Sequence, residues 1–254
     1  MPPKHSKIDV SIVIPAYKEA QRIGATLDEL GRYLKSADSL RAKEIEVIVV
    51  SADSADNTHE IVTAKARLFK HLELIKSGPK VGKGRDVKVG MLAARGEVVL
   101  FFDADLATPL QHIEQFLKLM DGGAQIVIAT RGIRRPGNDI LRETVSFVGN
   151  VLYRLLGGVW LEDSQCGFKM FSSQAAKICF SRLQLTGWGF DMEVLSIAKA
   201  QNIPITPVHI DDWHPVDGGS FDESILSNSF KAAAELLQIF WRRLSGSYRR
   251  RTPG

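Results

Sequence analysis

Short runs of β-branched and aromatic residues alternate with longer amphipathic stretches along the first half of the chain. Five such runs, each bounded by polar or turn-forming residues, predict buried strands over 9–15, 44–51, 72–77, 97–105 and 125–131. The stretches between them predict helices near 19–35, 56–70, 84–95 and 109–121. Regular alternation of this kind predicts an α/β fold with a doubly wound, mostly parallel sheet.

The hydrophobic pattern loosens after residue 131. A glycine-punctuated helix is expected near 141–157, and another helix is expected to begin with Asp191 and Glu193. By default we interpret Glu193 as a partner of the helix dipole. We therefore expect one domain over 1–220, divided into parts 9–131 and 132–220, followed by a separate C-terminal segment.

The C-terminal segment, 221–254, combines an amphipathic helix with a basic tail. Apolar residues recur there at spacings of three or four, which predicts a helix with one apolar face. Residues 242–254 hold five arginines and no acid, while the whole chain carries a formal charge of only +4. A basic tail on a nearly neutral body indicates a local anionic partner, and we expect no nucleic-acid binding.

Composition narrows the class of protein. A chain of 254 residues with 44% hydrophobic and 24% charged residues is typical of a globular domain with one sizeable core. Its two cysteines, Cys166 and Cys179, argue against a disulfide framework and favour a reducing compartment. Neither a signal peptide nor an apolar run of membrane-spanning length is evident, so we expect a soluble or peripheral protein.

Two carboxylates follow the fourth predicted strand, in "VVLFFDADLATPL". Ligands of doubly wound sheets bind beyond the carboxyl ends of the strands, where Asp103 and Asp105 are expected to lie. Carboxylates there suit a ribose hydroxyl and a hard divalent cation, Mg²⁺ or Mn²⁺, that is shared with phosphate oxygens. The alternative is structural, because the pair and Thr108 could cap the helix that starts near Pro109. The motif alone leaves both interpretations open.

Several motifs together carry a resemblance. "IVIPAYKEA", "GPKVGKG", "RGEVVLFFDADLATP" and "DSQCGFKMF" occur in the order seen in family 2 glycosyltransferases of the GT-A fold. The chain resembles in particular dolichyl-phosphate glucosyltransferases and dolichol-phosphate mannose synthases, from about residue 9 to about 220. The resemblance implies an inverting enzyme that moves one hexose, glucose or mannose, from UDP-glucose or GDP-mannose to a polyprenyl or dolichyl phosphate. It makes 9–131 the nucleotide-sugar half and 132–220 the acceptor half.

The resemblance also implies a set of site residues. Asp103 would face the ribose and sugar, and both aspartates, Asp105 above all, would hold the metal. Other donor-binding residues would be Pro15, Ala16, Tyr17, Glu19 and Lys83. "VSADSADNT" departs from the family pattern, since Ser51 and Ala52 replace two acids, and Asp53 is the candidate substitute. For Tyr17, simple packing at the strand end is the alternative.

Candidate acceptor and phosphate ligands follow the fifth strand. "ATRGIRRPG" places Arg131, Arg134 and Arg135 where forked donors would meet phosphate oxygens, with Gln165 nearby in the resemblance. The alternative for Arg134 and Arg135 is a solvated loop pair. Of these arginines, Arg131 is the best candidate for a catalytic role.

Asp163 matches the family's acidic residue near the acceptor. It would serve as a general base if a sugar hydroxyl attacks. A phosphate monoester, with a second pKa of ~6, is already largely anionic, so Asp163 would then orient a hydroxyl or Arg131. A carboxylate that caps a local turn is the structural alternative.

Other functions remain as rivals. A transferase acting on a saccharide hydroxyl and a non-catalytic nucleotide-sugar binding module are both open, whereas "PAYKEAQRIG" lacks the Gly-rich loop expected of a nucleotidyltransferase. "TGWGFDMEV" lacks a Q-x-x-R-W motif, which favours single transfer. Trp213, His214 and Ser220 could fold over a diphosphate, and His214 alone is more often structural.

The end of the C-terminal helix suggests where the protein works. Phe240 and Trp241 adjoin Arg242 and Arg243 there. Aromatic and arginine side chains together suit an anionic membrane surface, although packing on the core is the commoner fate of such a helix. We expect a cytoplasmic protein, peripheral on the cytoplasmic face of a membrane.

Overall fold

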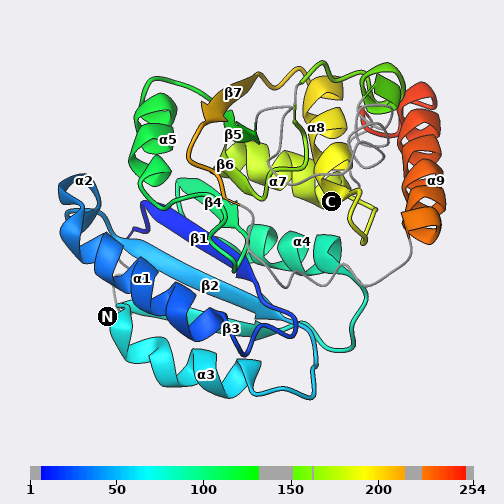
Figure 1. The fold of residues 1–254 in the computed structure, drawn as a ribbon. Coiled ribbons are helices and arrows are strands. Elements are labelled where there is room, and N and C mark those ends of the chain that lie inside the picture. The colour runs from blue at the N-terminus through cyan, green and yellow to red at the C-terminus, as the bar shows by residue number, and fades with distance from the viewer. Residues whose placement is uncertain (1–6, 132–150, 162, 215–224, 250–254) are drawn as a thin grey trace, which may run out of the picture.

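The computed structural model describes residues 7–131, 151–161, 163–214 and 225–249. In these residues, one seven-stranded sheet with the order β3-β2-β1-β4-β6-β5-β7 has helices on both faces (Figure 1). The predicted α/β fold is confirmed. The strands are Val10–Pro15 (β1), Ile45–Ser51 (β2), His71–Lys76 (β3), Val98–Phe102 (β4), Ile126–Arg131 (β5), Phe168–Ser172 (β6) and Ile205–Ile210 (β7).

The sheet is mostly parallel, with β6 as the exception. β6 pairs antiparallel with both β4 and β5, between which it is inserted. The sequence pattern predicted the first five strands but neither β6 nor β7. It also extended the fourth strand to residue 105, whereas β4 ends at Phe102. Residues 168–172 therefore complete the same sheet that carries the two aspartates.

The helices follow the predicted alternation. The four predicted between the first strands correspond to Ile23–Ser36 (α1), Thr58–Lys65 (α3), Lys83–Ala93 (α4) and His112–Asp121 (α5). Residues 151–157 are helical within the range expected near 141–157. The other helices are Asp38–Arg41 (α2), Ala66–Leu68 (η1), Ser173–Arg182 (α7), Phe190–Ala200 (α8) and Ile225–Leu244 (α9).

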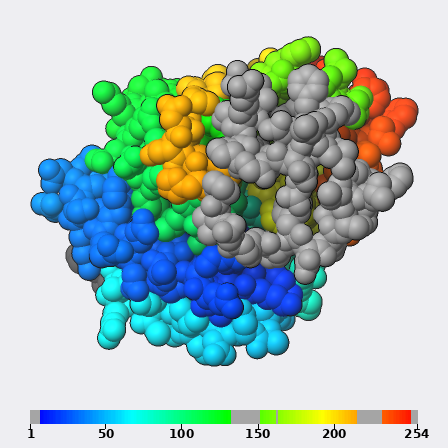
Figure 2. Space-filling model, in the orientation of Figure 1, coloured from blue at the N-terminus to red at the C-terminus, as the bar shows by residue number. Residues whose placement is uncertain are grey.

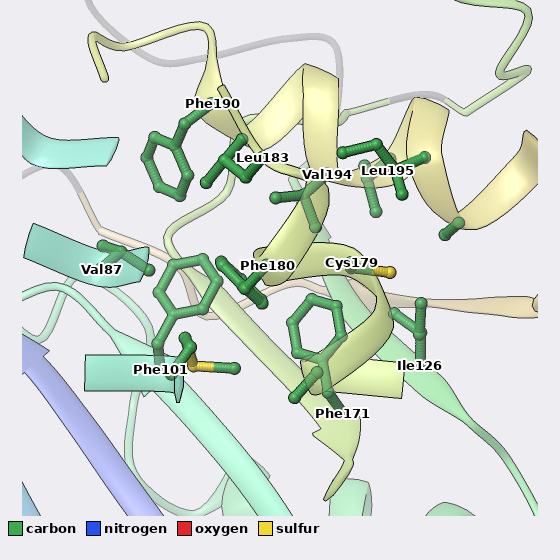
Figure 3. Close-up of a cluster of buried hydrophobic side chains, with 14 of the residues drawn as sticks. Val87, Phe101, Ile126, Phe171, Cys179, Phe180, Leu183, Phe190, Val194 and Leu195 are labelled. Carbon is green, nitrogen blue, oxygen red and sulfur yellow. The ribbon is translucent and has the colours of Figure 1, made fainter. Parts of the chain in front are cut away.

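Two hydrophobic layers enclose the sheet. Consecutive strand residues point to opposite faces, so Phe101 and Phe102 enter different layers. Phe101 packs with side chains from α4, α7 and α8, including Val87 and Phe180 (Figure 3). Phe102 lies in the layer formed with α1 and α5, where Phe116 contributes. Burial on both faces explains why the parallel strands read as continuous apolar runs.

The C-terminal helix α9 packs on the hydrophobic layer that contains Phe101, through Leu236 and Ile239. No helix among the described residues is long and apolar enough to cross a membrane. The division between 1–220 and 221–254 remains a prediction.

Glu193 on α8 connects the C-terminal segment to the core. It is fully buried, and its Oε1 accepts hydrogen bonds from Arg242 Nη1 at 2.8 Å and from the Tyr248 hydroxyl at 3.0 Å. Interpreting Glu193 only as a helix-dipole partner is therefore wrong. Arg242, which is partly exposed, is paired with this buried acid, and Arg243 donates to the Leu156 carbonyl at 3.0 Å, so both arginines have contacts within the fold.

Two helical glycines provide a matched test of the packing. A Cβ on Gly90 of α4 would overlap Val13 and lie 2.8 Å from Val50, whereas one on Gly31 of α1 would make an ordinary 3.5 Å contact. Alanine improves helix propensity by about 1 kcal/mol, but overpacking costs about 1–3 kcal/mol. We predict that Gly90→Ala lowers the free energy of unfolding, by up to about 2 kcal/mol, while Gly31→Ala raises it. Urea denaturation measures both, and an equal response of the two variants would contradict the packing described for α4.

Candidate active site

The carboxyl end of β4 is built around Asp103 and Asp105. The Asp103 amide donates to the Gly167 carbonyl at 3.1 Å, and Asp105 Oδ1 accepts the Ala107 amide at 3.1 Å in a local turn. Helix α5 begins only at His112, without a side-chain cap. The aspartates are therefore not caps of that helix, which removes the structural alternative for the pair.

Thr108 does not cap the helix either. Its hydroxyl lies 3.7 Å from the buried Cys166 thiol. Next to this cysteine, Gly167 has to be a glycine, because a Cβ there would overlap the carboxylate of Asp103. The "DSQCGF" segment therefore packs so closely against Asp103 that position 167 has no room for a side chain.

Lys83 forms an ion pair with the first aspartate. Its Nζ lies 2.5 Å from Asp103 Oδ1. Burial opposes the ammonium charge, but Asp103 and Asp191 outweigh it and raise the pKa of Lys83. The backbone amide of Gly84, one residue on, donates to the Thr186 carbonyl at 2.8 Å. The Lys83 side chain thus reaches Asp103, whereas the Gly84 amide in the first turn of α4 is already hydrogen-bonded within the protein.

Glu19 adds a third carboxylate near the pair. Burial raises the pKa of Glu19, the Arg22 guanidinium at 3.0 Å opposes this, and the charges of Asp105 and Asp103 add to the increase. The charges of Asp103 and Asp105 thus reach Glu19, and a cation at this end of the sheet would offset their mutual repulsion.

Arg131 and Asp163 form a buried fork. Arg131 Nε lies 2.5 Å from Asp163 Oδ2 and Nη2 lies 3.1 Å from Oδ1, while the Arg131 amide also donates to Oδ2 at 3.2 Å. Burial opposes the guanidinium charge, but this contact outweighs it and raises the pKa of Arg131. Because Asp163 also accepts the Gln165 amide at 3.0 Å, its role in the structure is to hold Arg131 and the following loop.

One pocket is lined by Asp103, Asp105 and Arg131 together. We call it the Asp103 pocket. Trp213 borders it, with its ring centroid 5.2 Å from Arg131 Cζ. The described residues that line it come from the end of β4, the turn that follows it, β5, the "DSQCGF" segment and the end of β7: Phe102, Asp103, Asp105, Leu106, Ala107, Thr108, Arg131, Gln165, Gly167, Phe168 and Trp213.

Of four other candidate residues, the structure describes only His214. His214 is exposed and donates its amide to the Ala107 carbonyl at 3.1 Å, which fits a structural role. Arg134, Arg135 and Ser220 lie outside the described residues. The pocket thus unites Asp103, Asp105, Arg131 and Gln165 among the predicted residues, with Asp163 directly behind Arg131.

The predicted nucleoside residues follow β1. Ala16 is buried and its carbonyl accepts the Ser51 hydroxyl at 2.7 Å, so Ser51 ties β1 to β2 where an acid was expected. Lys80 Nζ lies 4.7 Å from the centroid of the Tyr17 ring. Tyr17 therefore lies among cations and is not simply packed on the strand. Asp53 is exposed, with its amide bonded to the Gly78 carbonyl.

A buried ion pair beneath the site was missed by the sequence analysis. Lys169, the second residue of β6, is fully buried, and its Nζ lies 2.6 Å from Asp191 Oδ1 and 2.5 Å from the Cys166 carbonyl oxygen. Burial raises the pKa of Asp191, although Lys169 and Lys83 oppose the increase. The only signal was a lysine inside an apolar run, and its partner lies 22 residues away.

The fork makes a prediction about stability. Asp163→Asn keeps one acceptor but leaves the buried Arg131 without its counter-charge, so the free energy of unfolding should fall by about 1–3 kcal/mol. Urea denaturation at neutral pH measures it. Asp53→Asn, at an exposed position, is the control and should change stability by less than about 0.5 kcal/mol. If both variants are as stable as the wild type, the fork is not a stabilising contact.

Solved structures share the fold. Mannosyl-3-phosphoglycerate synthase from Rubrobacter xylanophilus aligns with a TM-score of 0.66 and 21% identity, covering 97% of this chain and 77% of that one. Glucosyl-3-phosphoglycerate synthase from Mycobacterium tuberculosis, in complex with Mn²⁺, UDP-glucose and phosphoglyceric acid, aligns with a TM-score of 0.63 and 20% identity, covering 92% and 80%. These similarities support the predicted GT-A fold.

Relatives identified by sequence share more identical residues with this chain than these solved structures do. The dolichyl-phosphate beta-glucosyltransferase ALG5C of Trichomonas vaginalis is 33% identical over 246 residues, which is 92% of this chain and 71% of the relative. The dolichyl-phosphate beta-glucosyltransferase of Saccharomyces cerevisiae is 30% identical, covering 96% and 77%. The family model described as Glycosyl transferase family 2 matches residues 11–179, which include all of β1 except Val10, the Asp pair and the "DSQCGF" segment. The chain therefore belongs to glycosyltransferase family 2.

Proposed function

We propose that this protein is an inverting transferase that moves one glucose from a nucleotide sugar to dolichyl phosphate. The observation that carries the proposal is the Asp103 pocket, in which two carboxylates and a buried, forked arginine face one another. The names of the relatives support glucose and dolichyl phosphate as the transferred group and acceptor. UDP-glucose is our candidate donor.

The donor would lie across the carboxyl ends of β1 and β4. Tyr17, with Lys80 beside its ring, offers a cationic and aromatic surface to a nucleotide. Pro15, Ala16 and Glu19 would border the nucleoside, while Asp103 would face ribose and sugar. Lys83 balances the charge of Asp103, and so it keeps the aspartates compatible with an anionic donor.

The donor set fits a divalent cation, Mg²⁺ or Mn²⁺. Among the described residues, no group of three or more His, Cys, Asp or Glu side chains could hold a metal unaided. Asp105 and Asp103 would thus be the protein's share of the ligands, with the diphosphate supplying others, as is usual for Mg²⁺. A cation bound there offsets the negative charge of the leaving nucleotide.

The acceptor side explains why no strong base is required. A lipid phosphate is already anionic at neutral pH, since its second pKa is ~6. Arg131 would meet the phosphate with the donors that the fork leaves available, and Gln165 lines the same pocket. Arg134, outside the described residues, stays a predicted phosphate ligand. Asp163 would act as a positioning residue, because it holds both Nε and Nη2 of Arg131.

We also propose a peripheral position on the cytoplasmic face of a membrane. Leu237, Trp241 and Leu244 on α9 are each more than half exposed, at the spacing of one helix face. Such a face suits a bilayer interface, where tryptophan is favoured. Flotation of the protein with anionic vesicles measures this, and a protein that does not float with them would contradict it.

The decisive experiment compares acceptors. We predict transfer from UDP-glucose to a polyprenyl phosphate and not to a free saccharide. Arg131→Ala should lower kcat/KM by about 10²–10³-fold, as loss of a charge-stabilising donor does. Asp163→Asn should lower turnover by less than the 10²–10⁴-fold expected when a general base is removed.

The alternatives make different predictions for the same assay. A nearly inactive Asp163→Asn beside an active Arg131→Ala would favour attack by a hydroxyl. Transfer to a saccharide, or donor binding without any transfer, would favour the two rival functions.

Asp105→Asn tests the metal. Asn Oδ1 can still accept the Ala107 amide, so the local turn survives, but the amide cannot replace the lost charge. We predict that Mn²⁺ with UDP-glucose raises the melting temperature of the wild type and not of Asp105→Asn. Saturation at a hundredfold excess over Kd corresponds to about 2.7 kcal/mol. Asp121→Asn, at an exposed position at the end of α5, is the matched control, and an unchanged Mn²⁺ response in Asp105→Asn would remove Asp105 from the metal site.

A further inference from the structure

Both chain neighbours of Lys83 pack against the loop between α7 and α8, residues 183–189. The Gly84 amide donates to the Thr186 carbonyl at 2.8 Å. A Cβ on Gly82 would overlap that same carbonyl oxygen, and a Cβ on Gly84 would lie 2.9 Å from another carbonyl oxygen of the loop. The backbone of Lys83 therefore has to follow the position of this α7–α8 loop.

The side chain of Lys83 meets the same loop. Its Nζ lies 5.0 Å from the centroid of the Trp188 ring, and it also pairs with Asp103 Oδ1 at 2.5 Å. An ammonium group over an indole ring is attracted by the π electrons of the ring. The α7–α8 loop thus contacts Lys83 through both backbone and side chain, directly beside Asp103.

Glu193 holds the α7–α8 loop with one of its carboxylate oxygens. Its Oε2 accepts the Leu185 amide at 2.6 Å and the Gln184 amide at 3.0 Å. Glu193 and Leu185 are both buried, and hydrogen bonds are stronger where water is excluded. The position of the loop therefore depends on how Glu193 itself is held.

The C-terminal segment holds the other carboxylate oxygen of Glu193. Its Oε1 accepts hydrogen bonds from Arg242 Nη1 at 2.8 Å and from the Tyr248 hydroxyl at 3.0 Å. A fully buried carboxylate needs such donors and a counter-charge. Burial, and then the charge of Glu193, raise the pKa of Tyr248, so the hydroxyl stays protonated and donates.

Helix α9 also holds the far end of the loop. The Gly189 amide donates to Glu235 Oε2 at 2.9 Å. The C-terminal segment is thus hydrogen-bonded to the loop at Gly189 and, through Glu193, at Leu185.

We propose that Arg242 and Tyr248 are positioning residues for the nucleotide-sugar donor. They act through Glu193 and the α7–α8 loop on Lys83. This coupling rests on the proposed function, in which Lys83 balances Asp103 beside an anionic donor. Every link is a hydrogen bond or a close packing contact, so a displaced C-terminal segment moves the ammonium group relative to the carboxylate. The C-terminal segment is then part of the donor site as well as of the fold.

Donor affinity, which requires no turnover, tests the coupling by calorimetric titration with UDP-glucose and Mn²⁺. Tyr248→Phe removes only a hydroxyl and should raise the Kd about threefold, the effect of one hydrogen bond. Arg242→Gln also removes a charge and should raise the Kd about tenfold. Arg242→Lys keeps a charged donor and should recover most of that loss. The KM for polyprenyl phosphate should stay the same, because none of these contacts reaches the Arg131 fork.

A double variant shows whether the effect passes through Lys83. In a Lys83→Gln background, Tyr248→Phe should change the Kd for UDP-glucose little further, because the group that it positions is already lost. Effects of independent sites multiply in Kd. Multiplying effects of Lys83→Gln and Tyr248→Phe would therefore overturn the coupling, even if each variant alone weakens donor binding.

Tyr33→Phe is the matched control. It removes a hydroxyl that donates to another glutamate, at 3.2 Å from Glu114 Oε2. Tyr33 lies toward the end of α1, on the opposite side of the molecule from α9 (Figure 2). Its loss should leave the Kd for UDP-glucose unchanged. If Tyr248→Phe lowers stability to urea but binds the donor as tightly as Tyr33→Phe does, its contact is only structural and the coupling is wrong.

Binding and transfer separate the coupling from the proposed function. A wild type that binds UDP-glucose but glucosylates no acceptor would contradict the function, and the Kd values of the variants would still decide on the coupling. If transfer occurs and Tyr248→Phe and Arg242→Gln bind the donor like the wild type, the coupling is wrong and the function stands. A wild type that does not bind UDP-glucose overturns both.

Discussion

Lys169 places a positive charge in the middle of the sheet, and the arrangement of the site depends on how that charge is compensated. A buried ion is costly unless it is paired and hydrogen-bonded. Here Asp191 from α8 and the Cys166 carbonyl both lie within 2.6 Å of the ammonium nitrogen. The ion pair therefore joins β6, α8 and the "DSQCGF" segment, and this segment meets Asp103 through Gly167.

The other charges of the site follow the same principle. Lys83 is matched with Asp103, and Arg131 is matched with Asp163. Each cation is fixed by an acid from another part of the chain, which limits the side-chain entropy that a substrate would have to remove on binding. A site of this kind is preorganised for anionic phosphates, and this is the physical basis of the transfer proposed above.

The loop that contains Trp188 connects α4 with α9. α4 carries Lys83, which pairs with Asp103, α9 presents its apolar face to solvent, and the loop is hydrogen-bonded to both helices. Glu193 strengthens the connection, since it binds the loop through Leu185 and the C-terminal segment through Arg242.

The sequence by itself determined the layered α/β fold and the position of the Asp pair, because both depend on local patterns. Apolar runs and helical periods identify the first five strands, and parallel strands bring their carboxyl ends to one edge. Only the tertiary structure decided that β6 runs antiparallel, that Lys169 pairs with Asp191, and that Glu193 is a buried acceptor. These contacts join residues distant in sequence or segments without a clear period, so their energies arise only when the chain has folded.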